Sequence, residues 1–197
     1  MNLDENISIV KEKPAIFLEG ELVYLRPLDY EDISGDYQYW LNDKNICKLN
    51  QHHRYPVTKD ELEDFIKNTR ADKNSIVLAV VQKSNNQHIG NVCLQKINFI
   101  NRTAEIASII AQKTANGFLC TLESMKLITA HGFNEINLNR IYGGTPTEHA
   151  VILKTVEMLG YSLEGISRQA IYKNGKYLDV QNYSILREEF LKNELYK

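Results

Sequence analysis

Residues 103–121, TAEIASIIAQKTANGFLCT, decide the fold of this chain. The first nine are rich in Ile and Ala, which predicts a strand covered on both faces. From Phe118 to Asn134 the apolar residues recur at helical spacing. A buried strand that leads through a glycine loop into a helix can hold phosphate, because free amides at the helix N-terminus point toward the anion. The loop matches neither the P-loop nor the Rossmann pattern, and a lone Gly117 is more often an ordinary turn.

Strands and helices flank this unit on both sides. Strand-like alternation or continuous apolar character predicts six further strands, at 21–26, 76–81, 89–97, 140–145, 163–172 and 178–187. Helical spacing and capping residues predict four helices, at 29–41, 58–70, 118–134 and 148–159. Asn85-Asn86 and Asn174-Gly175 are typical turns between paired strands. The order predicts a mixed sheet with helices on its faces, in the α/β (α+β) class.

Composition narrows the class of protein. The chain has 197 residues with a net charge of -2, 43% apolar and 24% charged residues, which is typical of a globular domain. Its longest apolar run, 76–81, is too short to span a bilayer, and no basic excess favours a nucleic-acid partner. We therefore expect neither a membrane nor a nucleic-acid partner. Residues 1–20 read as an N-terminal extension, 21–190 as the domain and 191–197 as a C-terminal tail.

The N-terminus and the cysteines indicate the compartment. Residues 1–6 are polar and acidic, with no apolar segment behind a basic start, so no signal peptide is predicted. Cys47, Cys93 and Cys120 are odd in number and widely spaced, which favours reduced thiols over a disulfide framework or a zinc site. These features predict a cytoplasmic protein without a bound metal.

Eight short motifs, in order, resemble the GNAT superfamily of acyl-CoA-dependent N-acetyltransferases over about residues 21–190. The similarity is greatest to the branch of ribosomal-protein N-terminal, spermidine and nucleotide-amino-sugar acetyltransferases. The motifs are Tyr24-Leu25-Arg26-Pro27-Leu28, Tyr39-Trp40-Leu41-Asn42-Asp43, Ala104-Glu105-Ile106, Gly117 with Glu123, Asn137-Leu138-Asn139-Arg140-Ile141-Tyr142, Glu157-Met158-Leu159-Gly160-Tyr161 with Glu164-Gly165, Gly175-Lys176-Tyr177-Leu178-Asp179 and Tyr183-Ser184-Ile185-Leu186. The resemblance implies a seven-stranded, mostly antiparallel sheet with about four helices, whose fourth and fifth strands splay apart.

The resemblance also implies an acetyl-CoA site in the splay. Amides of Ile109, Ile110 and Ala111 would bind the pantetheine arm, because an edge opened inside a sheet leaves donors that a ligand must satisfy. The pyrophosphate would lie at the next loop and helix start, which comprise Asn116, Gly117, Phe118, Leu119, Cys120 and Thr121. His149 stands where the family has a cofactor-contacting Asn in its fourth helix.

Several positions depart from the family pattern. Only the first glycine of the family loop, Gly117, is present, and Leu119 places a branched side chain where the backbone approaches the pyrophosphate. Main-chain amides remain available whatever the side chain. Val156 replaces the Tyr that can protonate the departing thiolate. These departures leave open a non-catalytic relative that keeps the fold as a binding module.

Three residues are candidates for proton transfer. Glu105 lies beside the implied acyl site, where a carboxylate can accept the amine proton directly or through water. The alternative is that Glu105 is an ordinary strand residue whose carboxylate faces solvent or a neighbouring Lys. Tyr142, across the splay, can replace the missing acid, although a buried Tyr that bonds the backbone is commoner. Ser108 is a weaker candidate, because strand hydroxyls usually bond locally.

The acceptor side is predicted between the first two helices. His52, His53 and Arg54 border the implied acceptor site and could orient an anionic substrate, although a solvated loop is the simpler interpretation. Adjacent histidines on an extended chain point apart and no third ligand is spaced to complete a metal site. Trp40 belongs to the signature that points to a nucleotide-linked amino sugar, although helix-to-sheet packing explains it more simply.

The predicted activity is acetyl-CoA-dependent N-acetylation of a primary amine by direct attack. The favoured acceptor is a small molecule such as a nucleotide-linked amino sugar. A protein N-terminus or a polyamine is the alternative. The sequence leaves the acceptor and a homodimeric state open.

Overall fold

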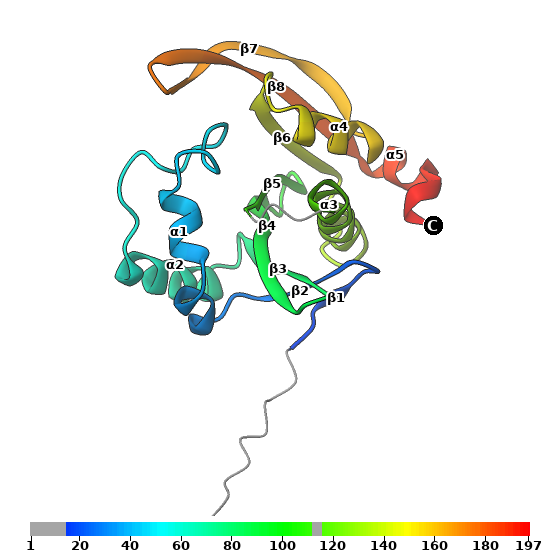
Figure 1. Ribbon diagram of the computed structural model, residues 1–197. Coiled ribbons are helices and arrows are strands. Elements are labelled where there is room, and N and C mark those ends of the chain that lie inside the picture. Colours follow the sequence, from blue (N-terminus) through cyan, green and yellow to red (C-terminus); the bar gives the residue numbers. More distant parts are fainter. Residues whose placement is uncertain (1–14, 112–115) are drawn as a thin grey trace, which may run out of the picture.

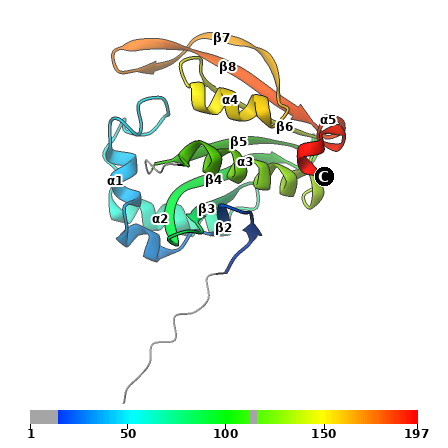
Figure 2. The same ribbon diagram turned by 45° about the vertical axis from the view of Figure 1, so that its right-hand side comes forward.

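The protein is described by a computed structural model that places residues 15–111 and 116–197. The described residues form one eight-stranded sheet in the order β1-β2-β3-β4-β5-β6-β8-β7 (Figures 1 and 2). The strands are β1 (Leu18–Glu19), β2 (Val23–Pro27), β3 (Ile76–Gln82), β4 (Gln87–Asn98), β5 (Thr103–Ile110), β6 (Arg140–Pro146), β7 (Ser162–Lys173) and β8 (Lys176–Leu186). All neighbours are antiparallel except β5 and β6, which confirms the mixed, mostly antiparallel GNAT-type sheet.

Helices cover both faces of the sheet. The helical segments are η1 (Tyr30–Ser34), α1 (Tyr37–Asn42), α2 (Lys59–Ala71), α3 (Gly117–Asn134), α4 (Ala150–Met158), α5 (Arg187–Lys192) and η2 (Glu194–Tyr196). One apolar core lies beneath α3, α4 and α5, and a second lies beneath η1, α1 and α2. Figure 1 shows α1 and α2 on one side of β4 and β5 and α3 on the other. None of the described helices is long and apolar enough to cross a membrane.

The sheet opens between β5 and β6. These strands pair only at Thr103 with Arg140, Ala104 with Ile141 and Glu105 with Tyr142. Beyond Glu105, β5 pairs only with β4, and beyond Tyr142, β6 pairs only with β8. The splay predicted from the family resemblance is therefore present, and Glu105 stands at its apex.

The structure corrects two elements of the predicted fold. The helix expected over 29–41 is broken into η1 and α1, because Gly35 adopts an extended ψ of -149° between them. An eighth strand, β1, lies within the segment expected as an extension, and it pairs with β2 through Leu18 and Glu19. The Asn174-Gly175 turn is confirmed, with φ of 50° and 81° at the two residues.

Glu123 on α3 anchors the first strands to the helix layer. Its carboxylate accepts hydrogen bonds from the backbone amides of Glu21, Leu22 and Val23 at 2.7, 2.8 and 2.8 Å. A Cβ on Gly20 would lie 2.5 Å from this carboxyl carbon, so glycine is required for the close approach. Glu123 can therefore bond the start of β2 because Gly20 has no side chain.

Replacing Glu123 with Ala is expected to lower the free energy of unfolding by about 2 kcal/mol, because three amides lose a charged acceptor at a partly buried site. Chemical denaturation of the purified variant measures this loss. Glu157→Ala, in an exposed i,i+3 pair with Lys154, is the matched control and should cost under about 0.5 kcal/mol. Equal losses in the two variants would contradict the anchoring role.

Candidate active site

A cavity of about 780 Å³ passes through the splay, because residues from both faces of the sheet line it. From the α1–α2 face come Tyr37, Leu41, Asn91 and Ile109. The α3–α4 face contributes Ile106, Met125, Ile152 and Tyr183. The tip of the β7–β8 hairpin closes one wall, since Lys173 Nζ donates to the backbone carbonyl of His52. The cavity therefore spans the sheet at the apex.

The open edge of β5 offers amides to a ligand. The amide of Ala111 donates to the carbonyl of Ile89 at 2.9 Å, so it is already engaged with β4 and not free for pantetheine. Backbone groups alternate between the two edges of a strand. By that alternation Ile109 also faces β4, whereas Ile106, Ser108 and Ile110 direct their amides toward the splay. Of the three predicted residues, Ile110 is the one whose amide faces the open edge.

The start of α3 supplies a second group of donors. Asn116 is the N-cap residue without a side-chain capping bond, and Gly117 begins the helix. The amides of the first turn, which includes Gly117, Phe118 and Leu119, have no partner within the helix. Thr121 bonds back to the Gly117 carbonyl at 2.8 Å and Cys120 is buried, so these side chains face the protein. Leu119 is 44% exposed, so its side chain points away from the core.

His149 is placed to contact a cofactor from the opposite wall. It caps α4, where its Nδ1 accepts the amide of Ile152 at 3.5 Å, and it lines the cavity. Burial lowers the pKa of His149, so the ring is neutral at neutral pH. With Nδ1 accepting, the proton is on Nε2, which can donate to a ligand.

Glu105 lines the cavity at the apex and is 24% exposed at its side chain. Its Oε2 lies 2.7 Å from Lys96 Nζ, and this contact raises the pKa of Lys96. The carboxylate therefore already holds an ammonium group beside the splay. Tyr142, its partner across the strands, lies under the Arg140 guanidinium at 5.6 Å and is not among the residues that line the cavity.

The structure divides the predicted acceptor residues. His52 lines the cavity, and burial together with Lys173 lowers its pKa. His53 and Arg54 are exposed outside it, and Arg54 bonds Gln51 at 2.7 Å. Trp40 is 4% exposed and packs its ring 4.9 Å from that of His88, so it belongs to the second core and not to the cavity wall.

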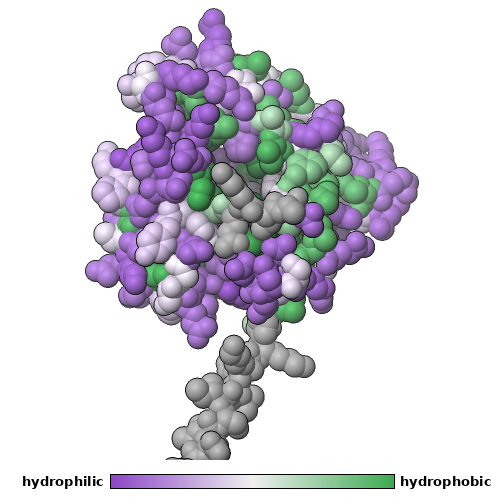
Figure 3. All heavy atoms as spheres, viewed as in Figure 1, coloured by the Kyte–Doolittle hydropathy of each residue, from purple (hydrophilic) through white to green (hydrophobic). Residues whose placement is uncertain are grey.

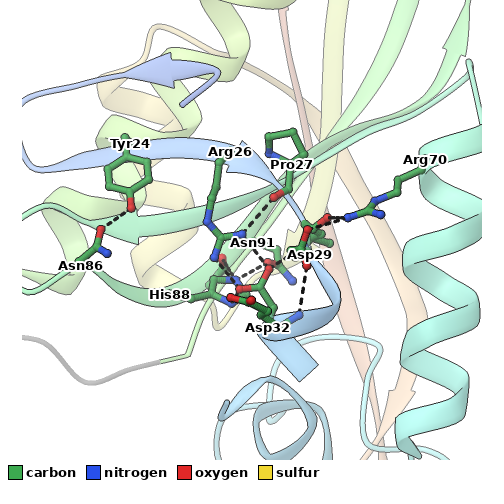
Figure 4. Close-up of polar contacts among 12 residues, drawn as sticks. Tyr24, Arg26, Pro27, Asp29, Asp32, Arg70, Asn86, His88 and Asn91 are labelled. Atoms are coloured by element: carbon green, nitrogen blue, oxygen red, sulfur yellow. Dashed lines mark hydrogen bonds and ion pairs between the residues drawn. The ribbon is translucent and has the colours of Figure 1, made fainter. Parts of the chain in front are cut away.

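A buried ionic network supports the acceptor side of the cavity (Figure 4). Arg26 donates to both carboxylate oxygens of Asp32 at 2.6 and 2.8 Å, and His88 Nδ1 lies 3.2 Å from Asp32 Oδ1. The other ring nitrogen of His88 lies 2.8 Å from Oδ1 of Asn91, which lines the cavity. Burial alone would raise the pKa of Asp32, but the bonds from Arg26 and His88 hold it well below its usual range. The network fixes the position of Asn91.

Sequence reasoning missed four of the polar cavity residues, namely Tyr37, Asn91, Asp72 and Tyr183. Tyr183 stands within a motif that carries the family resemblance, but nothing in the motif shows which way its hydroxyl points. Tyr37 and Asn91 reach the cavity only because β4 and α1 are brought together by folding. Among the described residues, no group of three or more His, Cys, Asp and Glu side chains is placed to hold a metal.

Apolar side chains on α3 and α4 are exposed at the surface. Leu119 on α3 and Val151 on α4 are each nearly half exposed. Figure 3 shows hydrophobic residues gathered over these helices within a mostly hydrophilic surface. This surface suits the aliphatic pantetheine arm, and the unpartnered Ser108 Oγ and the open β5 edge offer polar partners for its amides. The residues present therefore fit acetyl-CoA.

Comparison with known proteins agrees with this site. Residues 23–162 match the acetyltransferase (GNAT) domain family. The chain is 33% identical over 151 residues to the spermidine N(1)-acetyltransferase of Vibrio cholerae serotype O1, covering 76% of this chain and 85% of that protein. It is 27% identical to the corresponding enzyme of Escherichia coli K12, covering 86% and 88% of the two chains.

The fold agrees as well. The crystal structure of spermidine N-acetyltransferase from Vibrio cholerae in complex with CoA and spermine superposes with a TM-score of 0.75 at 26% identity, covering 88% of this chain and all of that one. The family match spans more than half of the chain, and it includes the splayed strands and the start of α3. The chain therefore belongs to the GNAT acetyltransferase family and is an N-acetyltransferase that uses acetyl-CoA as its donor.

Proposed function

We propose that the acceptor is a linear polyamine or diamine, acetylated on a primary amine by direct attack. This replaces the nucleotide-linked amino sugar as the favoured substrate class. The charge of the cavity carries the proposal. Among the described residues, the strongly charged ones that line it are Asp72, Glu105 and Lys96, and Lys96 is already paired with Glu105.

The two carboxylates favour a substrate with more than one positive charge. Asp72 accepts from the Asn74 amide and the Ser75 hydroxyl at 2.8 and 2.7 Å, and these bonds lower its pKa, so it is ionised. No arginine lines the cavity within the described residues, so a nucleotide diphosphate has no bidentate partner there. Polyamine ammonium groups can instead pair with Asp72 and Glu105.

Glu105 is the proposed base for the reaction. An ammonium group that displaces Lys96 from Glu105 gives its proton to the carboxylate, directly or through one water, and becomes a nucleophile. The free β5 amides at the splay are aimed where negative charge develops on the thioester oxygen. Positioning of the two substrates across the apex supplies the remaining rate enhancement.

The similar proteins support this class of acceptor. Those from Vibrio cholerae and Escherichia coli are spermidine acetyltransferases by name, and one solved structure holds CoA and spermine. Identity of 27–33% does not carry substrate choice by itself. The cavity charge is an independent observation that points to the same class.

A panel of amines tests the proposal. The purified protein is assayed with acetyl-CoA and spermidine, spermine, a diamine, a monoamine of equal length, a nucleotide-linked amino sugar and a peptide with a free N-terminus. We expect kcat/KM for the best polyamine or diamine to exceed that for the sugar and the peptide at least about tenfold, a difference of about 1.4 kcal/mol. A preference for the sugar or the peptide would overturn the polyamine assignment.

A variant separates charge recognition from general activity. Asp72→Asn should raise KM for the polyamine about threefold to fivefold, the upper range for an ion pair at an exposed carboxylate, and leave KM for the monoamine within about twofold, because only the polyamine carries a second charge that can pair with Asp72. Asp64→Asn, at an exposed position of α2, is the matched control and should change neither value.

A further inference from the structure

Tyr183 is a buried phenol at the apex of the splay that the reaction described above does not use. It lies on β8, is 4% exposed and lines the same cavity as Glu105. Its ring packs edge-on against that of Tyr161 at 5.8 Å, which holds its orientation. Burial, reinforced by the charge of Glu105, raises the pKa of Tyr183, so its hydroxyl keeps its proton at neutral pH.

Gly143 makes room for this hydroxyl at the splay. A Cβ on Gly143 would lie 2.9 Å from the Tyr183 hydroxyl oxygen and 2.7 Å from its ring. Gly143 follows Tyr142, the last residue of β6 that pairs with β5. The phenol therefore lies over the backbone of β6 at the point where the two strands separate.

Tyr183 and Glu105 approach the apex from opposite faces. Tyr183 belongs to the core beneath α3 and α4. Ala104 and Ile106 face that core too, and since neighbouring strand residues alternate, Glu105 faces the α1–α2 side. The two groups thus flank any thioester that passes through the opening.

Ser108 gives a second, independent sign that a ligand's polar atom belongs here. It points to the same face as Ile106, two residues earlier on β5. Its Oγ is buried and has no hydrogen-bond partner among the described residues. Buried hydroxyls are nearly always bonded, so a ligand at the α3–α4 side of the apex would supply the missing partner.

From this arrangement we infer that Tyr183 is the general acid that protonates the departing thiolate. It would take over the role of the family tyrosine that Val156 replaces. The inference rests on the direct-transfer reaction proposed above, but not on the identity of the amine. Val156 is a buried residue of α4 and has no proton to donate. Tyr142 does not line the cavity, and Tyr37 lies on the acceptor side. Tyr183 is the remaining cavity tyrosine of the described residues.

The proton transfers balance. The neutral amine forms a bond to the acetyl carbon, and the carbon–sulfur bond breaks with its electron pair on sulfur. Tyr183 donates its phenolic proton to that sulfur and regains one from solvent. Glu105 releases to solvent the proton that it took from the ammonium group, and the attacking nitrogen loses its second proton to solvent as the amide forms. The net change is one amide, one thiol and one proton from one ammonium and one thioester.

Tyr183→Phe tests the inference, because it removes the hydroxyl and keeps the ring. We expect kcat to fall about a hundredfold, the lower end of what a positioned acid contributes, with the CoA dissociation constant and melting temperature near wild type. Tyr161→Phe is the matched control. Its hydroxyl is also buried, bonded to Thr129 at 2.8 Å, but it does not line the cavity, so kcat should stay within about threefold of wild type.

The assay uses whichever amine the wild-type enzyme acetylates best. If the proposed acceptor class is wrong, the substrate preference of the wild-type enzyme shows it, whereas a wrong assignment of the acid shows only in the activity of the variant. A Tyr183→Phe enzyme within about threefold of wild-type kcat, or an equal fall in both tyrosine variants, would overturn the assignment. If Tyr183→Phe does not fold, Gly143→Ala displaces the same hydroxyl, and a folded Gly143→Ala enzyme with unchanged kcat would likewise overturn it.

Discussion

Glu105→Gln is expected to lower kcat for amine acetylation by about 10²- to 10⁴-fold, because the amide cannot accept the ammonium proton. Glu105 stands at the last paired position of β5 and β6 and holds the Lys96 ammonium at 2.7 Å. The substitution keeps the shape of the side chain, so CoA affinity should hardly change. Raising the pH should recover part of the rate, since more of the amine is then neutral in solution.

A second glutamine variant makes this result specific. Glu164 is also a strand carboxylate paired with a cation, Arg140, but it does not line the cavity. Glu164→Gln should retain wild-type kcat within about threefold. If Glu105→Gln retained it equally, Glu105 would be a structural strand residue and a bound water the more plausible base.

Asp32→Asn is expected to destabilise the fold by about 3 kcal/mol at pH 7, because it leaves the Arg26 guanidinium and the His88 ring without their buried anion. Arg26 keeps 19% of its side-chain exposure, which places the loss at the low end for a broken buried pair. Urea unfolding at pH 7 measures the difference. Asp64→Asn, exposed on α2, should shift the free energy of unfolding by under about 0.5 kcal/mol.

The same carboxylate predicts a pH dependence. The pKa of Asp32 is lower in the folded chain than in the unfolded chain, so its stabilising contribution is present above the unfolded value of about 3.9. It is lost as the pH falls from there through the folded pKa. The gap between wild type and Asp32→Asn should therefore narrow below about pH 4. A gap that stayed constant to pH 3 would show that Asp32 acts by shape and not by charge.

Local signals in the sequence determined most of the secondary structure. Thr58 and Glu61 form the expected capping box at the start of α2, and Asn174-Gly175 turns between β7 and β8 with both residues at positive φ. Such signals are reliable because the interacting atoms lie within a few residues of each other. The family resemblance likewise located the splay between β5 and β6.

Where the secondary structure differs from the prediction, residues far apart in the sequence make contact. The helix expected over 29–41 is interrupted at Gly35, and in its first part Asp32 bonds Arg26, His88 on β4 and the Asp29 amide. The helical periodicity of the sequence cannot show such contacts with a distant strand. Trp40, which the sequence offered either as an acceptor residue or as packing between helix and sheet, packs in the second core against His88.

The cavity at the splay also combines features that the sequence determined with features that only the tertiary structure decided. The sequence by itself determined the family, the donor and a carboxylate on β5, since each depends on residue types at short spacing. Only the tertiary structure decided which phenol lies at the apex, on the opposite face from that carboxylate. Tyr183 reaches the apex because β8 pairs with β6 and because Gly143 leaves its backbone uncovered. Strand order and cross-strand approach arise from packing the whole sheet, so no local pattern encodes them.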